Sequence, residues 1–489
     1  MLRQPLIALL LAGCCFTSVA FAQETPPDVP DQPLPADTDQ PTPPIAPKTQ
    51  DIPLPPAVEL PAPPTPSATP EQPLTADEAA RIALRLQPDV TVADAGITAA
   101  AGRTQQARSG LRPNVGVGAS YTRDQSISGS SSRSSTGGTG GTVEGDRFGG
   151  SSGTRISANV GQLLFDFNRT RNLVREAAAR ERAAGANLTR VQSDLVLRVK
   201  QAFYTYVQNT RLVGVNEINL RNRQEQLALA QARLNVGLGL PADVVRAQTA
   251  VAEAVFDLQQ ARNTASTSRV ELALLMGIDP RTPLQAGDSS EPAIPTDDVN
   301  ALVDTALGQR PEVVQAEATL QAAGFGVSAA RRTNAPSVSA NVGANARGDS
   351  LVPRSSSLSA GLVLQWSPFD GGLTRGRVQE AQANVTTAQA DLTNAQLTVT
   401  SDVSQACLNL RTAEQRVVTA DAQIVNAEES VRLAQGRYRA GIGTFIEVTD
   451  AQAALLTART NRVNAVSAVD QARAALARAT GAPIPPAEP

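Results

Sequence analysis

Two long stretches of this sequence are copies of each other. Positions from Phe165 to Gly277 align without a gap with the positions 204 residues later, Phe369 to Gly481 (369 − 165 = 204). A repeat of this length far exceeds the ~34-residue unit of a helical solenoid, so each copy is a half-molecule with its own set of elements. We therefore expect a duplicated fold with pseudo-symmetry. Matched pairs include Arg233 and Arg437, Gly237 and Gly441, Gly239 and Gly443, and Gln248 and Gln452.

The copies extend upstream at a different spacing. Pro88 and Pro113 match Pro311 and Pro336, in both cases 223 residues later (311 − 88 = 223). The first half therefore holds 19 additional residues (223 − 204 = 19). They fall in a stretch dominated by Ser and Gly, which cannot bury enough apolar surface to order itself and which predicts a loop.

The N-terminus predicts export. Residues 1–22 combine Arg3, an apolar run and a final Ala-Phe-Ala, the pattern of a secretory signal peptide. The sequence from Leu11 to Cys14 also fits a bacterial lipoprotein cleavage box, in which case Cys14 is lipidated. We prefer the later cut because the box follows a very short apolar stretch. Residues 23–73 are dense in Pro, Asp, Gln and Thr and predict a flexible tether.

Composition excludes several classes of function. The chain has no His, so it cannot build a Ser-His-Asp or Cys-His catalytic set. Cys407 is alone outside the signal peptide, which rules out disulfides within the chain and argues against His/Cys metal sites. A formal net charge of −3 argues against a nucleic-acid partner. We expect no enzymatic activity, no cofactor and no bound metal.

The second half contains a coiled-coil pattern. Apolar or small residues recur every third or fourth position from Val378 to Tyr438, with one extra four-residue step between Val399 and Val403. This pattern predicts one helix from about Gly372 to Ala440, followed by a return helix after Gly443. The corresponding first-half helix is expected from about Asn168 to Val236. The predicted seam residues are Val378, Ala381, Val385, Ala388, Leu392, Ala395, Val399, Val403, Ala406, Leu410, Ala413, Val417, Ala420, Ile424, Ala427, Val431, Ala434 and Tyr438.

Four shorter stretches alternate apolar with small polar residues, as strands do when one face meets lipid and the other meets water. The alternative is a half-buried hairpin of a soluble protein. No stretch after the signal peptide approaches the ~18–20 apolar residues of a spanning helix, so a membrane-embedded form must use strands. Four strands cannot close a barrel, since the smallest outer-membrane barrels use about 8. Several chains must then contribute, most simply with cyclic symmetry.

Together these features resemble the outer membrane efflux proteins of the TolC type, over residues 73–481. Three features carry the resemblance. They are the duplication, the Phe-Asp pair before each long helix, and the segment that contains Arg437, Tyr438, Gly441, Glu447 and Gln452. The resemblance implies a mixed α and membrane β fold, in which a homotrimer forms a 12-stranded β-barrel, four strands per chain, on a long periplasmic α-helical coiled-coil tunnel. The location implied is the outer membrane of a Gram-negative bacterium, in contact with its lipid.

The resemblance also implies a function. It predicts a passive exit duct for tripartite efflux or type I secretion, opened by a periplasmic adaptor protein and an inner-membrane pump of the RND, ABC or MFS class. Two alternatives from other classes are a trimeric coiled-coil surface adhesin and a periplasmic lipoprotein scaffold. An adhesin has no need of duplicated helical hairpins with Gly-rich tips. A scaffold would lack a heat-modifiable trimer in the membrane fraction.

The predicted organisation has six parts. They are the signal peptide (1–22), the Pro-rich segment (23–73), the first repeat (74–280), a linker (281–295), the second repeat (296–481) and a C-terminal tail (482–489). The first repeat is expected to hold strands at about 114–123 and 154–164, the Ser/Gly loop 125–153 and a helical hairpin at 168–277. The second is expected to hold strands at about 337–346 and 357–367 and a hairpin at 372–480.

The turns of the two hairpins are the candidate functional sites. By resemblance, Val236, Gly237, Leu238 and Asp243 match the tip motif that docks the adaptor, and Gly441 and Ile442 are its looser second copy. The alternative is that they are ordinary helix-turn residues, with Gly chosen for backbone freedom. We favour docking because several apolar residues lie at these turns, although a turn of this kind does not need to bury any side chain.

The entrance of the channel is predicted beside the second tip. Glu447 and Asp450 are spaced i, i+3 and share a helix face; by resemblance they form acidic rings that attract cations. The alternative is a solvated helix face. Tyr438 and Asp243 match the network that closes the constriction. Gly443 stands where the commonly described channel has Arg, so we expect that ion pair to be absent or replaced.

Overall fold

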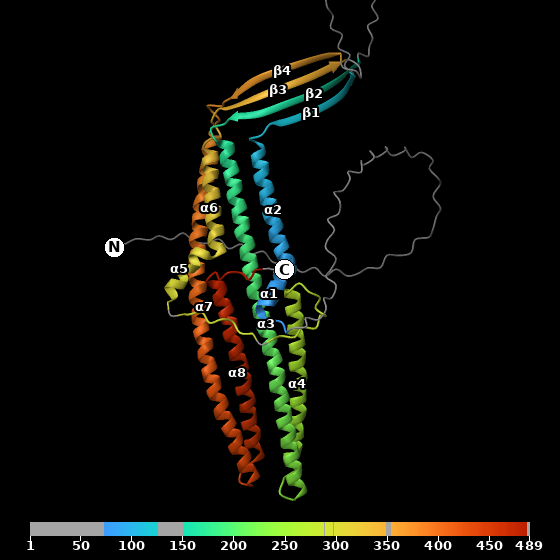
Figure 1. Cartoon of the computed structure of the whole chain (residues 1–489), viewed down its shortest axis with the longest axis vertical. Helices are drawn as coiled ribbons and strands as arrows, with labels where there is room; N and C mark the ends of the chain where they lie inside the picture. Colours follow the sequence, from blue (N-terminus) through green and yellow to red (C-terminus); the bar gives the residue numbers. More distant parts are fainter. Residues whose placement is uncertain (1–72, 126–149, 288, 297, 349–353, 487–489) are drawn as a thin grey trace, which may run out of the picture. The chain divides into compact units, whose positions relative to one another are not determined.

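A computed structural model describes residues 73–125, 150–287, 289–296, 298–348 and 354–486. The predicted signal peptide, Cys14, nearly all of the Pro-rich segment and nearly all of the Ser/Gly loop lie outside the described residues. Within these ranges the elements are helices and one antiparallel sheet, arranged as Figure 1 shows.

Two helical hairpins dominate the described chain. The first pairs α3 (Arg169–Asn235) with α4 (Pro241–Leu275), and the second pairs α7 (Leu373–Arg439) with α8 (Phe445–Ala479). Both long helices have 67 residues and both return helices have 35. None of the helices in the described ranges carries a stretch long and apolar enough to cross a membrane.

The predicted seam of α7 is confirmed. All of its eighteen residues are buried or half-buried, while most other positions of the helix are exposed. Nine of the ten fully buried residues of α7 belong to the seam; the tenth is Cys407, which joins the apolar cluster beside Ala406 and Leu410. The spacing carries this strip along one side of the helix, where α8 packs against the part near the tip and α5 and α6 contact α7 as well.

Each half also has a broken helix beside its long one. In the first half α1 (Ala76–Leu86) is followed by α2 (Pro88–Ser109), and in the second α5 (Val299–Gln309) is followed by α6 (Pro311–Ala330). Pro88 and Pro311 each occupy the first position of the second helix, where the missing N–H costs nothing. The residue before each Pro is extended, because the proline ring disfavours the helical conformation there.

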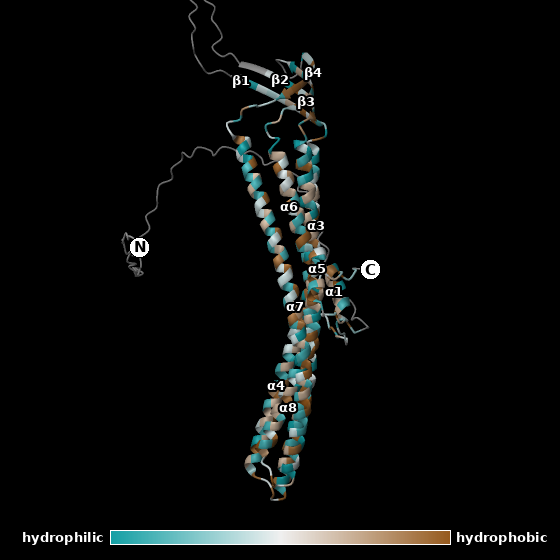
Figure 2. Ribbon diagram, turned by 90° about the vertical axis from the view of Figure 1, so that its left-hand side faces the viewer, coloured by the Kyte–Doolittle hydropathy of each residue, from teal (hydrophilic) through white to brown (hydrophobic). Residues whose placement is uncertain are grey.

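The sheet joins the two halves. Its strands are β1 (Asn114–Gln125), β2 (Gly150–Phe165), β3 (Ser337–Gly348) and β4 (Ser355–Gln365), in that order and all antiparallel. β2 begins four residues before the predicted 154, because the ladder with β1 continues to Gly150. Large apolar side chains on the sheet are exposed in the single chain, among them Val117 (77%) and Leu358 (79%). Teal and brown alternate along much of the helices in Figure 2.

Three apolar clusters support the helices. One packs α1, α3 and α4 around Phe203 and Met276, and a second packs α5, α7 and α8 around Val403 and Leu476. The third lies near the hairpin tips and holds residues of both hairpins, including Ala230 and Tyr438. The two hairpins are therefore in contact next to their turns, at the end of the helices away from the sheet (Figure 1).

Candidate functional site

The two tip turns have the same construction. The backbone N–H of Leu238 donates to the carbonyl of Arg233, and that of Ile442 donates to Arg437. Gly237 and Gly441 supply the left-handed conformation that this closure needs, with φ of 76° and 77°. The apolar side chains at the turns are left in solvent: Val236 is 68% exposed, Leu238 73%, Leu240 65% and Ile442 74%.

The second glycine of each turn is required by close packing. A Cβ at Gly239 would lie 2.7 Å from the backbone nitrogen of Leu234, and one at Gly443 would lie 2.8 Å from the Cβ of Arg437. Real Cβ atoms do not approach so closely, so no side chain fits at either position without moving the turn. An arginine at position 443, as in the commonly described channel, is therefore incompatible with this turn as it stands.

The cation next to the second turn is instead supplied by the other hairpin, which contacts the end of α7 here. Arg233 of α3 donates hydrogen bonds to the backbone oxygens of Tyr438 and Arg439, which end α7. Its guanidinium carbon also lies 4.6 Å from the centre of the Tyr438 ring, within cation–π range. The Tyr438 hydroxyl then donates to a carboxylate oxygen of Asp243 at 3.4 Å. One arginine, one tyrosine and one aspartate thus join the two hairpins.

Tyr438 is buried at the centre of this contact. It is 4% exposed, and its ring packs edge-on against Phe445 with centroids 5.7 Å apart. Burial raises the pKa of its phenol, and Asp243 adds to the rise. The neutral phenol therefore persists at neutral pH. Because the pKa of Tyr438 is higher in the folded chain, its neutral phenol contributes fully to the stability of the fold below the ordinary pKa of 10.0. This contribution is lost as the pH rises through the folded pKa.

The two predicted entrance carboxylates have different surroundings. Glu447 belongs to a capping box with Thr444: the Glu447 N–H donates to the threonine hydroxyl, and the glutamate accepts from the Thr444 N–H. The Glu447 side chain also lies 3.4 Å from Arg437. Asp450 is exposed and makes no ion pair with any described residue. Of the two, Asp450 is the carboxylate free to meet a cation in solution.

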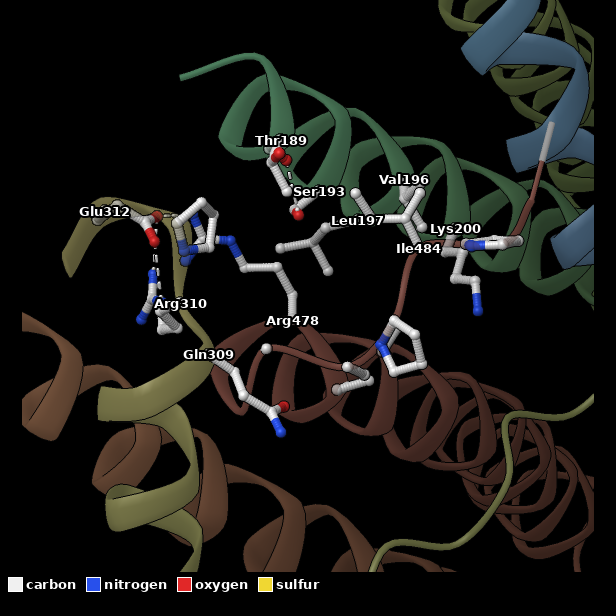
Figure 3. Close-up of a pocket in the computed structure, with 17 residues that line it drawn as sticks. Thr189, Ser193, Val196, Leu197, Lys200, Gln309, Arg310, Glu312, Arg478 and Ile484 are labelled. Atoms are coloured by element: carbon white, nitrogen blue, oxygen red, sulfur yellow. Dashed lines mark hydrogen bonds and ion pairs between the residues drawn. The ribbon is translucent and has the colours of Figure 1, made fainter. Parts of the chain in front are cut away.

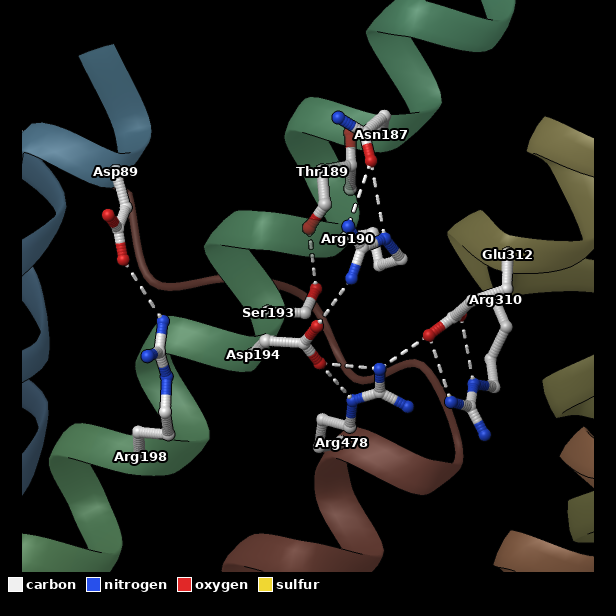
Figure 4. A network of polar contacts seen from close by, with 10 residues as sticks. All are labelled: Asp89, Asn187, Thr189, Arg190, Ser193, Asp194, Arg198, Arg310, Glu312 and Arg478. Carbon is white, nitrogen blue, oxygen red and sulfur yellow. Dashed lines mark hydrogen bonds and ion pairs between the residues drawn. The ribbon is translucent and has the colours of Figure 1, made fainter. Parts of the chain in front are cut away.

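A second polar network connects the halves midway along the helices. Arg478 of α8 binds Asp194 of α3 at 2.5 Å and also binds Glu312 of α6. Arg310, 2% exposed, binds Glu312 at 3.0 Å and Asp402 of α7 at 2.7 Å. Figure 4 shows most of this network from close by. Because every charge here has a partner, the network holds elements together and leaves no group free for chemistry.

The connection between the halves crosses the same region. Glu291 is 6% exposed and accepts from Lys200 at 2.7 Å and from the Tyr204 hydroxyl at 3.2 Å. Its own backbone N–H donates to Asp470, and its carbonyl accepts from Arg473. Burial raises the pKa of the Asp470 carboxyl. The linker thereby ties α3 to α8.

A cavity of about 240 Å³ opens beside this network, between α3 and the end of α8 (Figure 3). Its cationic residues are Lys200, Arg310 and Arg478, and each already binds a carboxylate. The cavity is thus lined by neutralised charges and by the C-terminal segment. In the described part of the chain, no three His, Cys, Asp or Glu residues lie close enough to hold a metal ion.

The comparison with known families decides the identity of the fold. The sequence profile described as outer membrane efflux protein matches residues 79–278 and again residues 302–482. The chain belongs to the outer membrane efflux protein family. The resemblance inferred from the sequence is confirmed, and with it the location in the outer membrane and the assignment to a class of transport proteins rather than enzymes.

Individual relatives are distant. The chain is 28% identical to Protein CyaE of Bordetella pertussis over 316 residues, which cover 63% of this chain and 66% of that protein. It is 25% identical to outer membrane efflux protein BepC of Brucella suis over 236 residues, covering 47% of this chain and 50% of the relative. The aligned region thus spans between a half and about two thirds of these curated relatives.

The fold matches solved channels more completely. The outer-membrane channel OprN superposes with a TM-score of 0.71, at 23% identity, over 84% of this chain and 91% of that chain. At this identity the likeness shows a shared fold, that of a TolC-like channel-tunnel.

Sequence reasoning missed Arg233. The structure brings Tyr438 and Asp243 together, as the resemblance implied, but the cation that completes the contact was not assigned. One signal for it was present: Arg233 and Arg437 occupy equivalent positions before the two tips. The structure does not bring Glu447 and Asp450 to a common partner, and it engages Glu447 within its own helix start.

The close packing at Gly443 makes a stability prediction. Gly443→Ala should destabilise the chain by roughly 1–3 kcal/mol, because the new Cβ overlaps Arg437 and the turn must shift. Gly436→Ala is the matched control: its Cβ meets nothing within 4 Å inside α7, so it should be neutral or stabilising by up to about 1 kcal/mol. Thermal unfolding followed by circular dichroism measures both. Equal midpoints would contradict the packing argument.

Proposed function

We propose that the chain is a passive outer-membrane exit duct, opened by a periplasmic adaptor and an inner-membrane pump. Three copies, each with two equivalent halves, would close a 12-stranded barrel from their four-stranded sheets. β1 and β4 are the edges of the sheet, with no strand partner among the described residues. Unpaired edges carry exposed N–H and C=O groups, which a neighbouring copy would satisfy.

The observation that carries the proposal is the contact between the two hairpin tips. Arg233, Tyr438 and Asp243 join two helical pairs at the end remote from the sheet, where a tunnel would be constricted. The contact combines these polar groups with the small apolar cluster around Ala230 and Tyr438, and it is much shorter than the apolar seam that runs along α7. It is thus a closure that can open without unfolding either hairpin.

The neighbouring surface between the hairpins supports this reading. Gln452 of α8 is 5% exposed and accepts from Arg223 of α3 at 3.2 Å. The carbonyl oxygen of the buried Gln226 side chain has no hydrogen-bond partner among the described residues. Buried polar groups with few partners gain hydration when an interface opens, which reduces the free energy of opening.

The first test is conductance. The purified protein in a planar bilayer should form stable channels, and Arg233→Gln should raise the open fraction about tenfold or more. One charge-assisted hydrogen bond contributes about 1.5–3 kcal/mol, and 1.4 kcal/mol is tenfold. Arg246→Gln, an exposed arginine on α4 with no ion pair to a described residue, is the control and should change nothing. A wild-type protein without conductance would refute the proposed function; equal opening in both variants would refute the gate.

The entrance is proposed to be lined by Asp450. Trivalent cations on the tip side should block conductance by bridging carboxylates of neighbouring copies, with an effect that weakens as salt screens exposed charges over about 8–10 Å. Asp450→Asn should weaken the apparent affinity for the cation about tenfold, as expected when a carboxylate ligand becomes neutral. Glu447→Gln should do less, since its carboxylate already binds Thr444 and Arg437. Block that survives in both variants would place the entrance elsewhere.

The tips are proposed to dock the adaptor. The two turns around Gly237 and Gly441 expose apolar surface in the described part of the chain, carried by Val236, Leu238 and Ile442. Leu238→Asp and Ile442→Asp should abolish adaptor capture and efflux while the trimer yield in the membrane fraction is unchanged, because exposed residues contribute little to the fold. Leu238→Met keeps an apolar side chain and is the control. Loss of the trimer together with efflux would show that these are structural turn residues.

A further inference from the structure

The strands contain a band without charge. Residues 114–122, 156–165, 337–346 and 355–366 include no Asp, Glu, Lys or Arg. Leu362 is 72% exposed and Leu364 66% on the same sheet. Under the proposed function this band lies in the hydrocarbon of the membrane, and the charged residues that follow it toward the helices lie at the level of lipid headgroups.

Nine exposed arginines gather where the strands give way to helices. They lie between 2 and 12 residues from the nearest strand (114 − 112 = 2; 377 − 365 = 12). The set, called here the arginine collar, consists of Arg108 in the last turn of α2, Arg112 just after α2, Arg169, Arg171 and Arg175 in α3, Arg331 and Arg332 after α6, and Arg375 and Arg377 in α7.

The collar is a single region of the molecule. α2 contacts α3, α3 contacts α6, and α6 contacts α7, so the four helices form one row. Figure 1 shows their ends together beside the sheet. The arginines are thus neighbours in space although they come from both halves of the chain.

The collar is not neutralised by the chain itself. None of its arginines makes an ion pair with a described residue. Asp166 and Asp370 nearby accept hydrogen bonds from the first turns of their own helices, at 2.7 Å from the Thr170 N–H and 2.8 Å from the Thr374 N–H. Glu176 binds Arg180 at 2.6 Å. Nine cations therefore face few carboxylates, and most of those already have partners.

Helix electrostatics explain only part of the collar. Arginines that follow α2 and α6 stand at helix C-termini, where a cation is favourable. Those of α3 and α7 stand at helix N-termini, where the helix dipole repels cations. Neither helix has an acidic residue in its first turn. Asp166 and Asp370 each accept N–H groups at one of these helix starts, so a single carboxylate stands there against three arginines of α3 and two of α7. This excess of cations indicates an anion supplied from outside.

Exposed aromatic residues surround the same junction. Phe165 is 51% exposed, Phe167 39%, Trp366 59% and Phe369 90%. Aromatic rings beside arginines are typical of the membrane–water interface, where the ring meets acyl chains and the guanidinium meets phosphate. A planar guanidinium matches the two oxygens of a phosphodiester.

We propose that the arginine collar binds the phosphate groups of anionic phospholipids in the membrane leaflet nearest the helices. This rests on the proposed function only in requiring the strands to be embedded in a membrane. The bound headgroups supply anions for the collar arginines, which make no ion pair with a described residue. The acyl chains of the same lipids lie against the charge-free band of the sheet.

The test compares two triple variants of equal charge change. Arg169→Gln, Arg332→Gln and Arg375→Gln together remove one collar residue of α3, one that follows α6 and one of α7. Arg221→Gln, Arg246→Gln and Arg416→Gln together remove three exposed arginines far along the hairpins, none of which pairs with a described carboxylate. Phosphatidylglycerol is titrated into each detergent-solubilised protein and bound lipid is counted by native mass spectrometry, with phosphatidylcholine as the comparison lipid.

The wild type and the hairpin variant should prefer phosphatidylglycerol, and the collar variant should bind it about tenfold or more weakly, as expected for the loss of three cations near an anionic surface. The variant with Lys at the same three positions should keep most of the preference, because the charge remains. No preference in the wild type, or equal loss in both triple variants, would overturn the proposal. So would full competition by inorganic phosphate, which indicates a simple anion site, or preferential binding of an anionic cell-wall fragment.

Failure of this inference is separable from failure of the proposed function. Trimer content and single-channel conductance are measured on the same preparations. A conducting trimer without lipid preference refutes the collar and leaves the duct intact. A protein that neither forms trimers nor conducts refutes the duct, whatever lipid it binds.

Discussion

The structure depends on the alternation of small and large residues along the seam of the long helices. A 67-residue helix cannot be held by its own hydrogen bonds alone, and it persists because a partner helix covers one side of it along much of its length. Alanines such as Ala406, Ala413 and Ala420 let the backbones approach closely, and the larger residues between them fill the remaining space. The result is two rigid helical hairpins, called rods below. Residues at their ends can take on other functions without affecting the packing within each hairpin.

Contacts between the two rods are of a different kind from contacts within them. Within the second hairpin the seam of α7 is apolar or small along the whole helix. Between the hairpins a small apolar cluster at the tips is accompanied by polar contacts, such as that of the buried Gln452 with Arg223. Apolar burial is lost when an interface opens, whereas polar groups exchange protein partners for water at small net cost. The linker contact of Glu291 with Lys200 and Tyr204, and the network around Arg478, hold the same rods together midway along their length. A short contact at the tips and a tied middle favour motion that is largest at the tips.

Sequence periodicity predicted the regular parts of this fold closely. The helix expected from about Gly372 to Ala440 is observed as Leu373–Arg439, because Gly and the heptad pattern both mark its ends. Strand ends were less predictable: β2 extends to Gly150, through Ser and Gly residues that have no preference of their own and follow the ladder of β1. Side-chain partners across the hairpins were the least accessible to sequence reasoning. The pairing of Arg233 with Tyr438 joins residues 205 positions apart and depends on how two rods are set side by side.

Turn geometry explains why the cation at the contact between the two tips comes from Arg233. Gly443 closes the second turn with its N–H on the carbonyl of Arg437, and its missing Cβ leaves the space that the Arg437 Cβ occupies. A long cationic side chain at position 443 would require the turn to move, directly before the capping box that begins α8 at Thr444. Arg233 avoids this conflict because it lies on a straight helix facing the ring of Tyr438. A tight second turn and a cation beside Tyr438 are thus compatible in this chain because the cation stands on the opposite hairpin. Different residues build the turn and join the two tips.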